Sequence, residues 1–286
     1  MKEAAQPLVP RRQHLSPDMI TDRFRNDDTE EFLRLAEAEG WISDQRELEF
    51  LLNAFPQGCL VKRDGTIPGA FITSIRYGLS GWIGNLLVHP ELRRRGVGAE
   101  LLLEALLALE NAGVETVWLT ASPSGKPLYE KLGFREIDRI NRWIGDGFAL
   151  TLPSEQRRMT AELRDLDTAG WGDRRDILLA SLEMEGCLLA EPDAFFISRM
   201  IGSLRQIGPL AGPPAATTAL FEQYLSPSPA GERICLDVPV KNSEMENFLE
   251  QQGLRLSGST VLMYTGVTPA YQPELIGACG SMGSMG

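Results

Sequence analysis

Apolar and polar positions follow two different periods in the first part of the chain. Apolar residues at helical spacing predict helices over 28–40 and 44–55. The next segment, 58–90, has runs of β-branched and aromatic residues that predict three strands. Turn signals at Asp64-Gly65 and within 78–81 separate these strands, so the pattern predicts two consecutive hairpins.

A strongly periodic apolar run then predicts a helix over about 98–112, with Gly113 placed to end it. A strand over 114–120, a short helix over 124–133 and a strand over 134–145 follow. Parallel strands need a crossover connection, so parallel pairing is expected only across the 98–112 helix. The order predicts an α/β fold of the α+β type, built on a mixed sheet.

The second half of the chain repeats this pattern. Ile83 matches Ile207 and Gly133 matches Gly253, at offsets of 124 and 120 residues, and both segments run strand, helix, strand, helix, glycine, strand. The repeat predicts two domains of one ancestry, and chance similarity between two α/β units is the alternative. The expected parts are a flexible arm over 1–17, domains over 18–150 and 151–270, and a disordered, low-complexity tail over 271–286.

Composition places the chain among ordinary globular proteins. It has 286 residues, of which 43% are hydrophobic and 23% charged. No apolar run reaches the roughly 20 residues that cross a bilayer, and the start lacks the apolar core of a signal peptide, so a cytoplasmic protein without a membrane partner is expected. The net charge of −11 argues against nucleic acid. It is compatible with a cationic partner or substrate, but solubility alone explains it better.

Cysteine and histidine are too sparse for several kinds of site. Four cysteines lie far apart without a C-x-x-C pair, and His14 and His89 are the only histidines. Neither a zinc site nor a disulfide framework is indicated. Catalysis by a Ser/His or Cys/His pair is disfavoured for the same reason. We therefore expect no metal.

The densest basic cluster of this acidic chain lies at the start of the 98–112 helix. The run Arg93-Arg94-Arg95-Gly96-Val97-Gly98, called the glycine turn below, precedes the helix directly. A helix N-terminus offers unpaired N–H groups and positive potential, and arginine adds bidentate donors. The turn predicts a diphosphate site; a solvated basic loop is the alternative. Neither the Walker nor the Rossmann glycine pattern fits it.

The stretches "LLVHPELRRRGVGAELL" (86–102) and "LYEKLGF" (128–134) together resemble the GNAT acyl-CoA N-acyltransferases. That family's Arg/Gln-x-x-Gly-x-Gly/Ala signature is here Arg93 to Gly98, and the resemblance covers about 20–145. It implies a GNAT fold and acetyl-CoA as acyl donor. "DRRDILLASL", "IGPLAG" and "ICLDVP" resemble the degenerate GNAT-like C-terminal domain of a bacterial two-domain group, which implies a smaller second domain of this kind.

The resemblance also implies roles for individual residues. Tyr129 matches the family's general acid. Ser124 lies in a segment where the family often has an asparagine that contacts the cofactor. The other cofactor-binding residues are expected to be Leu86, Leu87 and Val88, through the pantetheine, and Arg93, Arg94, Arg95, Gly96, Val97, Gly98 and Ala99, through the diphosphate.

The acceptor side is less defined by the sequence. Trp41, Trp82, Asn85 and Asp237 are the candidates for substrate contacts, and the general base is unassigned because "GWIGNLLV" has no carboxylate. The resemblance implies direct transfer of an acetyl group to a primary amine of a small molecule. A protein N-terminus or lysine is the alternative acceptor, a non-catalytic acyl-CoA sensor is the alternative of another class, and a homodimer is left open.

Overall fold

The computed structural model describes residues 19–153 and 157–286. The expected flexible arm over 1–17 lies outside the described residues. The chain divides into two compact units by its internal contacts. Unit 1 contains Met1–Arg135, Met263–Thr268 and Gly283–Met285, and unit 2 contains Glu136–Leu262, Pro269–Met282 and Gly286.

The sheet of unit 1 follows the predicted hairpins. Its first four strands are antiparallel, and the fifth is parallel to the fourth across a helix, as expected. The end of β12 (Arg255–Gly266) lies beside β5. The strands, in order across the sheet, are β1 (Ile20–Arg23), β2 (Leu60–Asp64), β3 (Ile67–Arg76), β4 (Ser80–Val88) and β5 (Thr116–Ala121). The pattern did not predict β1.

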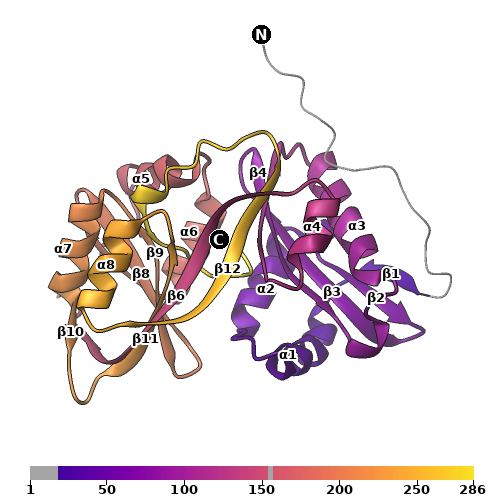
Figure 1. The fold of residues 1–286 in the computed structure, drawn as a ribbon, viewed down its shortest axis with the longest axis horizontal. Coiled ribbons are helices and arrows are strands. Elements are labelled where there is room, and N and C mark those ends of the chain that lie inside the picture. Colours follow the sequence, from indigo (N-terminus) through magenta and orange to yellow (C-terminus); the bar gives the residue numbers. More distant parts are fainter. Residues whose placement is uncertain (1–18, 154–156) are drawn as a thin grey trace, which may run out of the picture. The chain divides into compact units, whose positions relative to one another are not determined.

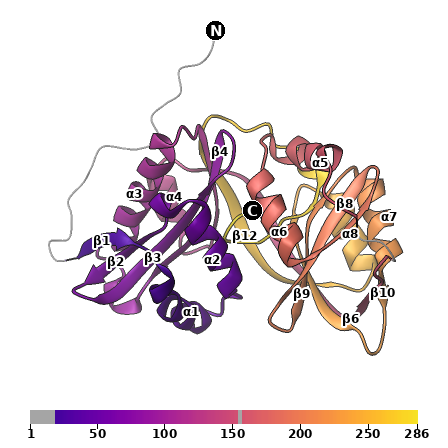
Figure 2. The same cartoon turned by 180° about the vertical axis from the view of Figure 1, so that it is seen from behind.

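Helices cover both faces of this sheet (Figures 1 and 2). On one face, Phe32 and Leu48 from the two early helices pack with Phe71 of β3; the third helix packs on the other. Gly113 has a φ of +82° and ends that third helix, as predicted. The helices are α1 (Thr29–Ala38), α2 (Gln45–Ala54), α3 (Val97–Asn111) and α4 (Lys126–Lys131), with 3-10 turns η1 (Asn26–Asp28), η2 (Pro56–Gly58) and η3 (Pro90–Leu92).

Unit 2 contains a mixed set of strands and a core of its own. Across the sheet the order is β12, β6, β11, β9, β8, β7, with β10 beside β6 and β13 beside β9. The strands are β6 (Arg135–Leu150), β7 (Cys187–Glu191), β8 (Ala194–Ile201), β9 (Leu204–Ala211), β10 (Leu225–Pro227), β11 (Glu232–Pro239) and β13 (Ile276–Ala278). The helices are α5 (Ala161–Trp171), α6 (Asp176–Glu185), α7 (Pro214–Tyr224) and α8 (Ser243–Gln251), with the 3-10 turn η4 (Pro273–Leu275).

The structure confirms the internal repeat. In unit 1, Ser80–Trp82 pair in parallel with Thr116–Trp118. In unit 2, Leu204–Gln206 pair in parallel with Arg233–Cys235, and the first strand of each pair is displaced by the predicted 124 residues. Each unit is therefore a mixed α/β layer built on the same strand–helix–strand core.

The contact-defined units differ from the expected boundary at residue 150. The segment Glu136–Leu150 lies in unit 2, because β6 pairs with β11 from Ile140 to Phe148. Conversely, Met263–Thr268 lie in unit 1, although the sequence placed them in the second domain. Local periodicity reports that a strand exists but not which sheet receives it.

The expectation of a disordered tail over 271–286 is wrong. Ile276 and Cys279 are buried in unit 2, and Met285 is 1% exposed. The glycines and serines that suggested low complexity are small enough for this backbone to pack closely on strands. Among the helices of the described residues, none has the length and apolar character needed to span a bilayer.

Candidate active site

β4 carries a β-bulge at its centre. Phe71 of β3 faces Leu87, and Thr73 faces Gly84, so one residue of β3 opposes two residues of β4. The first of the two, Asn85, has a φ of +54°, and its side-chain amide donates to Thr73 Oγ1 at 3.0 Å. A bulge bends the strand that contains the extra residue. The second half of β4 is thereby directed away from the line of its first half.

β4 and β5 part at this bend. Their parallel pairing among the described residues covers Ser80–Trp82 and Thr116–Trp118, ahead of the bulge. Beyond it, Leu87 and Val88 pair with β3 on one edge, and among the described residues their other edge has no strand partner. The other edge has the backbone groups that can hydrogen-bond an extended amide chain such as pantetheine. The geometry therefore fits the expected role of Leu86, Leu87 and Val88.

The glycine turn connects this edge to the N-terminus of α3. Gly96 caps the helix with a φ of +83°, and Arg94 also has a positive φ, +63°. A Cβ on Gly98 would lie 3.3 Å from Val88 Cγ2, so this glycine lets α3 approach the end of β4. Gly96 is required by its backbone conformation and Gly98 by packing. The amides of Gly96 to Ala99 thus begin α3 beside Leu86–Val88.

The three arginines of the turn differ in their surroundings. Arg93 donates through Nε to the Val88 carbonyl at 2.9 Å, and its Nη2 lies 2.5 Å from Glu39 Oε1. These bonds tie the turn to β4 and to the end of α1. Arg94 and Arg95 are exposed. The structure therefore shows that Arg93 connects the turn to β4 and to α1, and all three arginines stay candidates for diphosphate contacts.

A buried ion pair beneath the turn escaped the sequence analysis. Lys62 Nζ of β2 lies 2.5 Å from Glu100 Oε2 in the first turn of α3, and both side chains are almost fully buried. Because an unpaired charge there would be costly, each residue stabilises the other. The pair holds the start of α3 on the sheet. In the sequence, only the presence of a glutamate in the first turn of α3 pointed to this pair.

Tyr129 lies on α4, the short helix on the same face of the sheet as α3 (Figures 1 and 2). Its ring packs edge-on against Phe134, with centroids 5.9 Å apart. A Cβ on Gly125 would lie 3.2 Å from the ring, so this glycine leaves room for it. Ser122 accepts from the Gly125 N–H at 3.1 Å, and its hydroxyl lies 3.1 Å from that of exposed Ser124.

Burial raises the pKa of Tyr129 to about 12. The neutral phenol therefore persists as pH rises. If Tyr129 is the acid, kcat should show no falling limb below about pH 11. A pH profile of kcat from pH 6 to about 10.5 tests this, with any rising limb assigned to deprotonation of the amine. A falling limb near about pH 8–9 would point to another acid.

The two tryptophan candidates have opposite surroundings. Trp41, between α1 and α2, is 41% exposed, and its neighbour Ile42 is also exposed. Trp82 is 1% exposed, and its indole N–H donates to the Gly283 carbonyl at 3.5 Å. The prediction that Trp82 contacts the acceptor is wrong, because the core and residue 283 cover it. Trp41 stays a candidate.

The prediction that Asp237 acts in an acceptor site is also wrong. Asp237 lies on β11 in unit 2 and has no exposed surface. Its two oxygens accept from Arg142 Nε and Nη2, each at 2.7 Å, and Gln206 donates to it at 3.0 Å. Both oxygens of the carboxylate thus accept hydrogen bonds from side chains of the same unit. Asp237 is a structural residue.

Unit 2 repeats the bulge of unit 1 but not its open edge. Phe196 faces Leu210 and Ser198 faces Ile207, so Gly208 and Pro209 of β9 together oppose one residue of β8. Strand β13 pairs with the following residues of β9, at Leu210 and Ala211. The next amide, that of Cys279, donates to the Asp237 carbonyl of β11 at 2.8 Å. β13 therefore occupies the edge that corresponds to Leu86–Val88.

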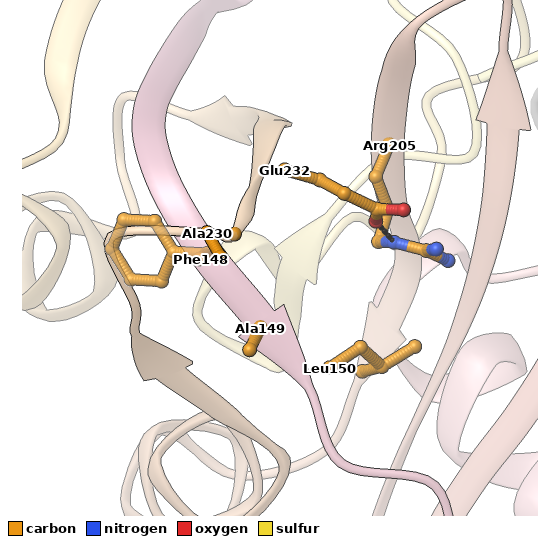
Figure 3. Close-up of a pocket in the computed structure, with 7 residues that line it drawn as sticks. Phe148, Ala149, Leu150, Arg205, Ala230 and Glu232 are labelled. Carbon is orange, nitrogen blue, oxygen red and sulfur yellow. Dashed lines mark hydrogen bonds and ion pairs between the residues drawn. The ribbon is translucent and has the colours of Figure 1, made fainter.

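A hollow of about 240 Å³ lies elsewhere in unit 2, between β6, β9 and the start of β11. Its arginine, Arg205, is held by Glu232 (Figure 3) and donates to Ser198 Oγ at 2.9 Å. These partners leave no free cationic group for a ligand there. Among residues 19–153 and 157–286, no cluster of three or more His, Cys, Asp or Glu side chains has the arrangement of a metal site.

Comparisons with known proteins agree with this geometry. A family model described as the acetyltransferase (GNAT) family matches residues 18–134, and a model described as an acetyltransferase (GNAT) domain matches 163–275. An N-alpha-acetyltransferase of Sulfurisphaera tokodaii is 29% identical over 99 residues, which are 29% of this chain and 59% of that protein. The ribosomal protein bS18-alanine N-acetyltransferase of Salmonella typhimurium is 44% identical over 55 residues, 18% of this chain and 37% of that protein.

The chain thus spans 59% and 37% of the lengths of these two curated relatives. Similarity of fold extends much further. A putative acetyltransferase structure from Pyrococcus horikoshii superimposes with a TM-score of 0.79 at 20% identity, covering 96% of this chain and 99% of that one. The two matched models together cover most of the chain, one in each half. The chain belongs to the GNAT acetyltransferase family, and it carries a second GNAT domain in its C-terminal half.

Proposed function

We propose that this chain transfers an acetyl group from acetyl-CoA to a primary amine of a small molecule, within a ternary complex. The observation that carries this is the open edge of β4 after the bulge at Asn85, which leads directly to the glycine turn at the start of α3. An extended thioester chain and its diphosphate require these two features in this order.

The proposed chemistry uses few protein groups. The Leu86–Val88 edge holds the pantetheine, and an N–H there stabilises the oxyanion that forms when the amine attacks the thioester carbon. The carbon–sulfur bond then breaks, and Tyr129 gives its proton to the departing thiolate. In water a phenol near ~10 and a thiol near ~8.5 make this transfer uphill. Burial that raises the pKa of Tyr129 also raises that of a thiol beside it, which limits the difference.

The amine must lose a proton before it attacks. A lysine-like amine near ~10.4 is neutral in about one molecule in 2,500 at pH 7, which costs about 4–5 kcal/mol. β4 supplies no carboxylate for this step. In the proposed mechanism a water molecule accepts this proton. Asn85, the polar residue of the bulge, orients that water or the amine.

The face that carries Trp41 favours a cationic acceptor. Trp41 and Ile42 are exposed. An exposed aromatic ring attracts an ammonium group. The α-amine of a protein N-terminus is a second candidate, because one curated relative is an N-alpha-acetyltransferase by name and another is named for an alanine of ribosomal protein bS18.

A thiol-release assay separates these acceptors. Purified full-length protein is incubated with acetyl-CoA and one amine at a time: polyamines, aminoglycosides, amino acids, and peptides with a free N-terminus. Release of coenzyme A with a small amine, and identification of its acetylated product by mass spectrometry, supports the proposal. Release with peptides alone would move the assignment to the second candidate. No release with any amine, despite binding of acetyl-CoA, would favour the non-catalytic sensor.

The structure also predicts how many cofactor molecules bind. Since β13 occupies the corresponding edge of unit 2, one acetyl-CoA should bind per chain although both units have the GNAT fold. Isothermal titration calorimetry with coenzyme A measures this number directly. A stoichiometry of about two per chain would mean that β13 leaves β9 when the ligand binds.

A further inference from the structure

The last residues of the chain lie on β4. Gly283–Met285, called here the C-terminal segment, belong to unit 1. The Trp82 indole donates to the Gly283 carbonyl at 3.5 Å, and the Tyr77 hydroxyl donates to the Met285 carbonyl at 2.5 Å. Ser284 and Met285 are both buried. The segment is therefore packed on the strand rather than loose beside it.

Gly84 makes this approach possible. A Cβ on Gly84 would lie 2.6 Å from the Gly283 carbonyl oxygen and 2.7 Å from Ser284 Cα. These are backbone atoms, which cannot turn away as the end of a side chain could. Gly84 is the last residue of β4 before the bulge at Asn85. The segment thus crosses the strand where its open edge begins.

The segment lies on the face of β4 opposite α3. A Cβ on Gly81 would meet Leu109 of α3 at 2.9 Å, and side chains alternate along a strand, so Trp82 and Gly84 point to the other face. On that face Leu87, beyond the bulge, packs with Phe32 of α1. α1 covers one part of β4 and the C-terminal segment covers the next. Because α3 closes the opposite face, an acceptor that attacks a thioester held at the Leu86–Val88 edge would come from this side.

Unit 2 holds the chain just ahead of the segment. β13 pairs with Leu210 and Ala211, and a Cβ on Gly208 would collide with the Cys279 carbonyl oxygen. The edge of β9 that corresponds to Leu86–Val88 of unit 1 therefore pairs with β13 instead of being open to a cofactor. The same strand leads, a few residues later, to the segment on β4.

We propose that the C-terminal segment forms a wall of the acceptor site and limits the size of the amine, and that β13 in unit 2 anchors it. This inference rests on the proposed function of unit 1. It gives the second GNAT domain a role in choosing the acceptor, with its former cofactor edge used as an anchor.

Two variants of the full-length chain test the wall. Gly84→Ala places a methyl group against the backbone of the segment and should displace it; a chain that ends at Gly280 lacks the segment but keeps β13. Gly258→Ala is the matched control, a strand glycine whose added methyl group meets nothing within 4 Å. Hydrogen exchange of the 281–286 peptide, measured without substrate, reports whether the segment lies on β4.

We expect slow exchange in the wild type and in Gly258→Ala, and fast exchange in Gly84→Ala. In both test variants, kcat/KM for a bulky amine relative to a small one should rise about tenfold, while KM for acetyl-CoA stays within about twofold. Fast exchange in the wild type, or unchanged selectivity once the segment is displaced, overturns the wall. Absence of turnover with every amine overturns the proposed function instead, and with it the wall's role in transfer.

Discussion

Replacing Tyr129 with phenylalanine is expected to lower kcat by about 10²–10⁴-fold. The substitution removes only the hydroxyl, and the ring keeps its edge-on contact with Phe134 at a centroid distance of 5.9 Å. The thiolate must then leave without a proton from the protein. The dissociation constant of acetyl-CoA should change little, because the expected cofactor contacts lie on β4 and at the start of α3. A thiol-release assay measures kcat, and calorimetry measures the dissociation constant of acetyl-CoA.

Tyr264→Phe is the matched control for this experiment. Tyr264 is also a buried tyrosine of unit 1, with its ring 6.0 Å from that of Trp118 and below the Arg135 guanidinium. The loss of its hydroxyl should leave kcat unchanged. If Tyr129→Phe retains wild-type turnover, Tyr129 is not the acid and water protonates the thiolate.

Replacing Arg142 with methionine is expected to destabilise unit 2 by about 3–5 kcal/mol, because an uncompensated charge is left buried. Arg142 makes two 2.7 Å bonds to Asp237, whose carboxylate has no exposed surface. Gln206 alone would remain as its polar side-chain partner. Urea unfolding followed by circular dichroism measures the shift in free energy.

The chain offers a surface pair as a control. Arg255 and Asp146 also form an ion pair in unit 2, at 2.6 Å, but both side chains are more than half exposed. Arg255→Met should cost at most about 1 kcal/mol. Arg142→Met should not change the affinity of unit 1 for acetyl-CoA. If Arg142→Met lost turnover while the free energy of unfolding stayed unchanged, the structural role of Asp237 would be contradicted. Asp237 would then again be a candidate for contacts with the acceptor.

Local patterns were sufficient for much of unit 1. The helix that became α3, its end at Gly113 and the parallel crossover to β5 follow from periodicity and turn residues that lie close together in the chain. The glycine turn and Tyr129 were found because their spacing is a short-range property. The 124-residue offset likewise predicted the second unit, since related strands keep their order.

Local patterns did not predict the pairings between residues that lie far apart in the chain. Nothing local distinguishes Asp237 as the partner of Arg142, or Trp82 as a residue covered by Gly283. A glycine within a strand does indicate a close backbone approach, so Gly84 was the one signal of the C-terminal segment that the sequence contained. The bulge at Asn85 had none, because it depends on the register with β3.

The sequence by itself determined the family, the order of elements, the glycine turn and the candidate acid, because each depends on neighbours within a few turns of helix or strand. Only the tertiary structure decided which edge of each sheet stays open. In unit 1 the edge after the bulge is free of β5, and in unit 2 β13 fills it. The two outcomes arise from similar strands. They differ because, in unit 2 only, residues about 65 positions further along the chain pair with the edge after the bulge, and such a distant pairing has no local signal.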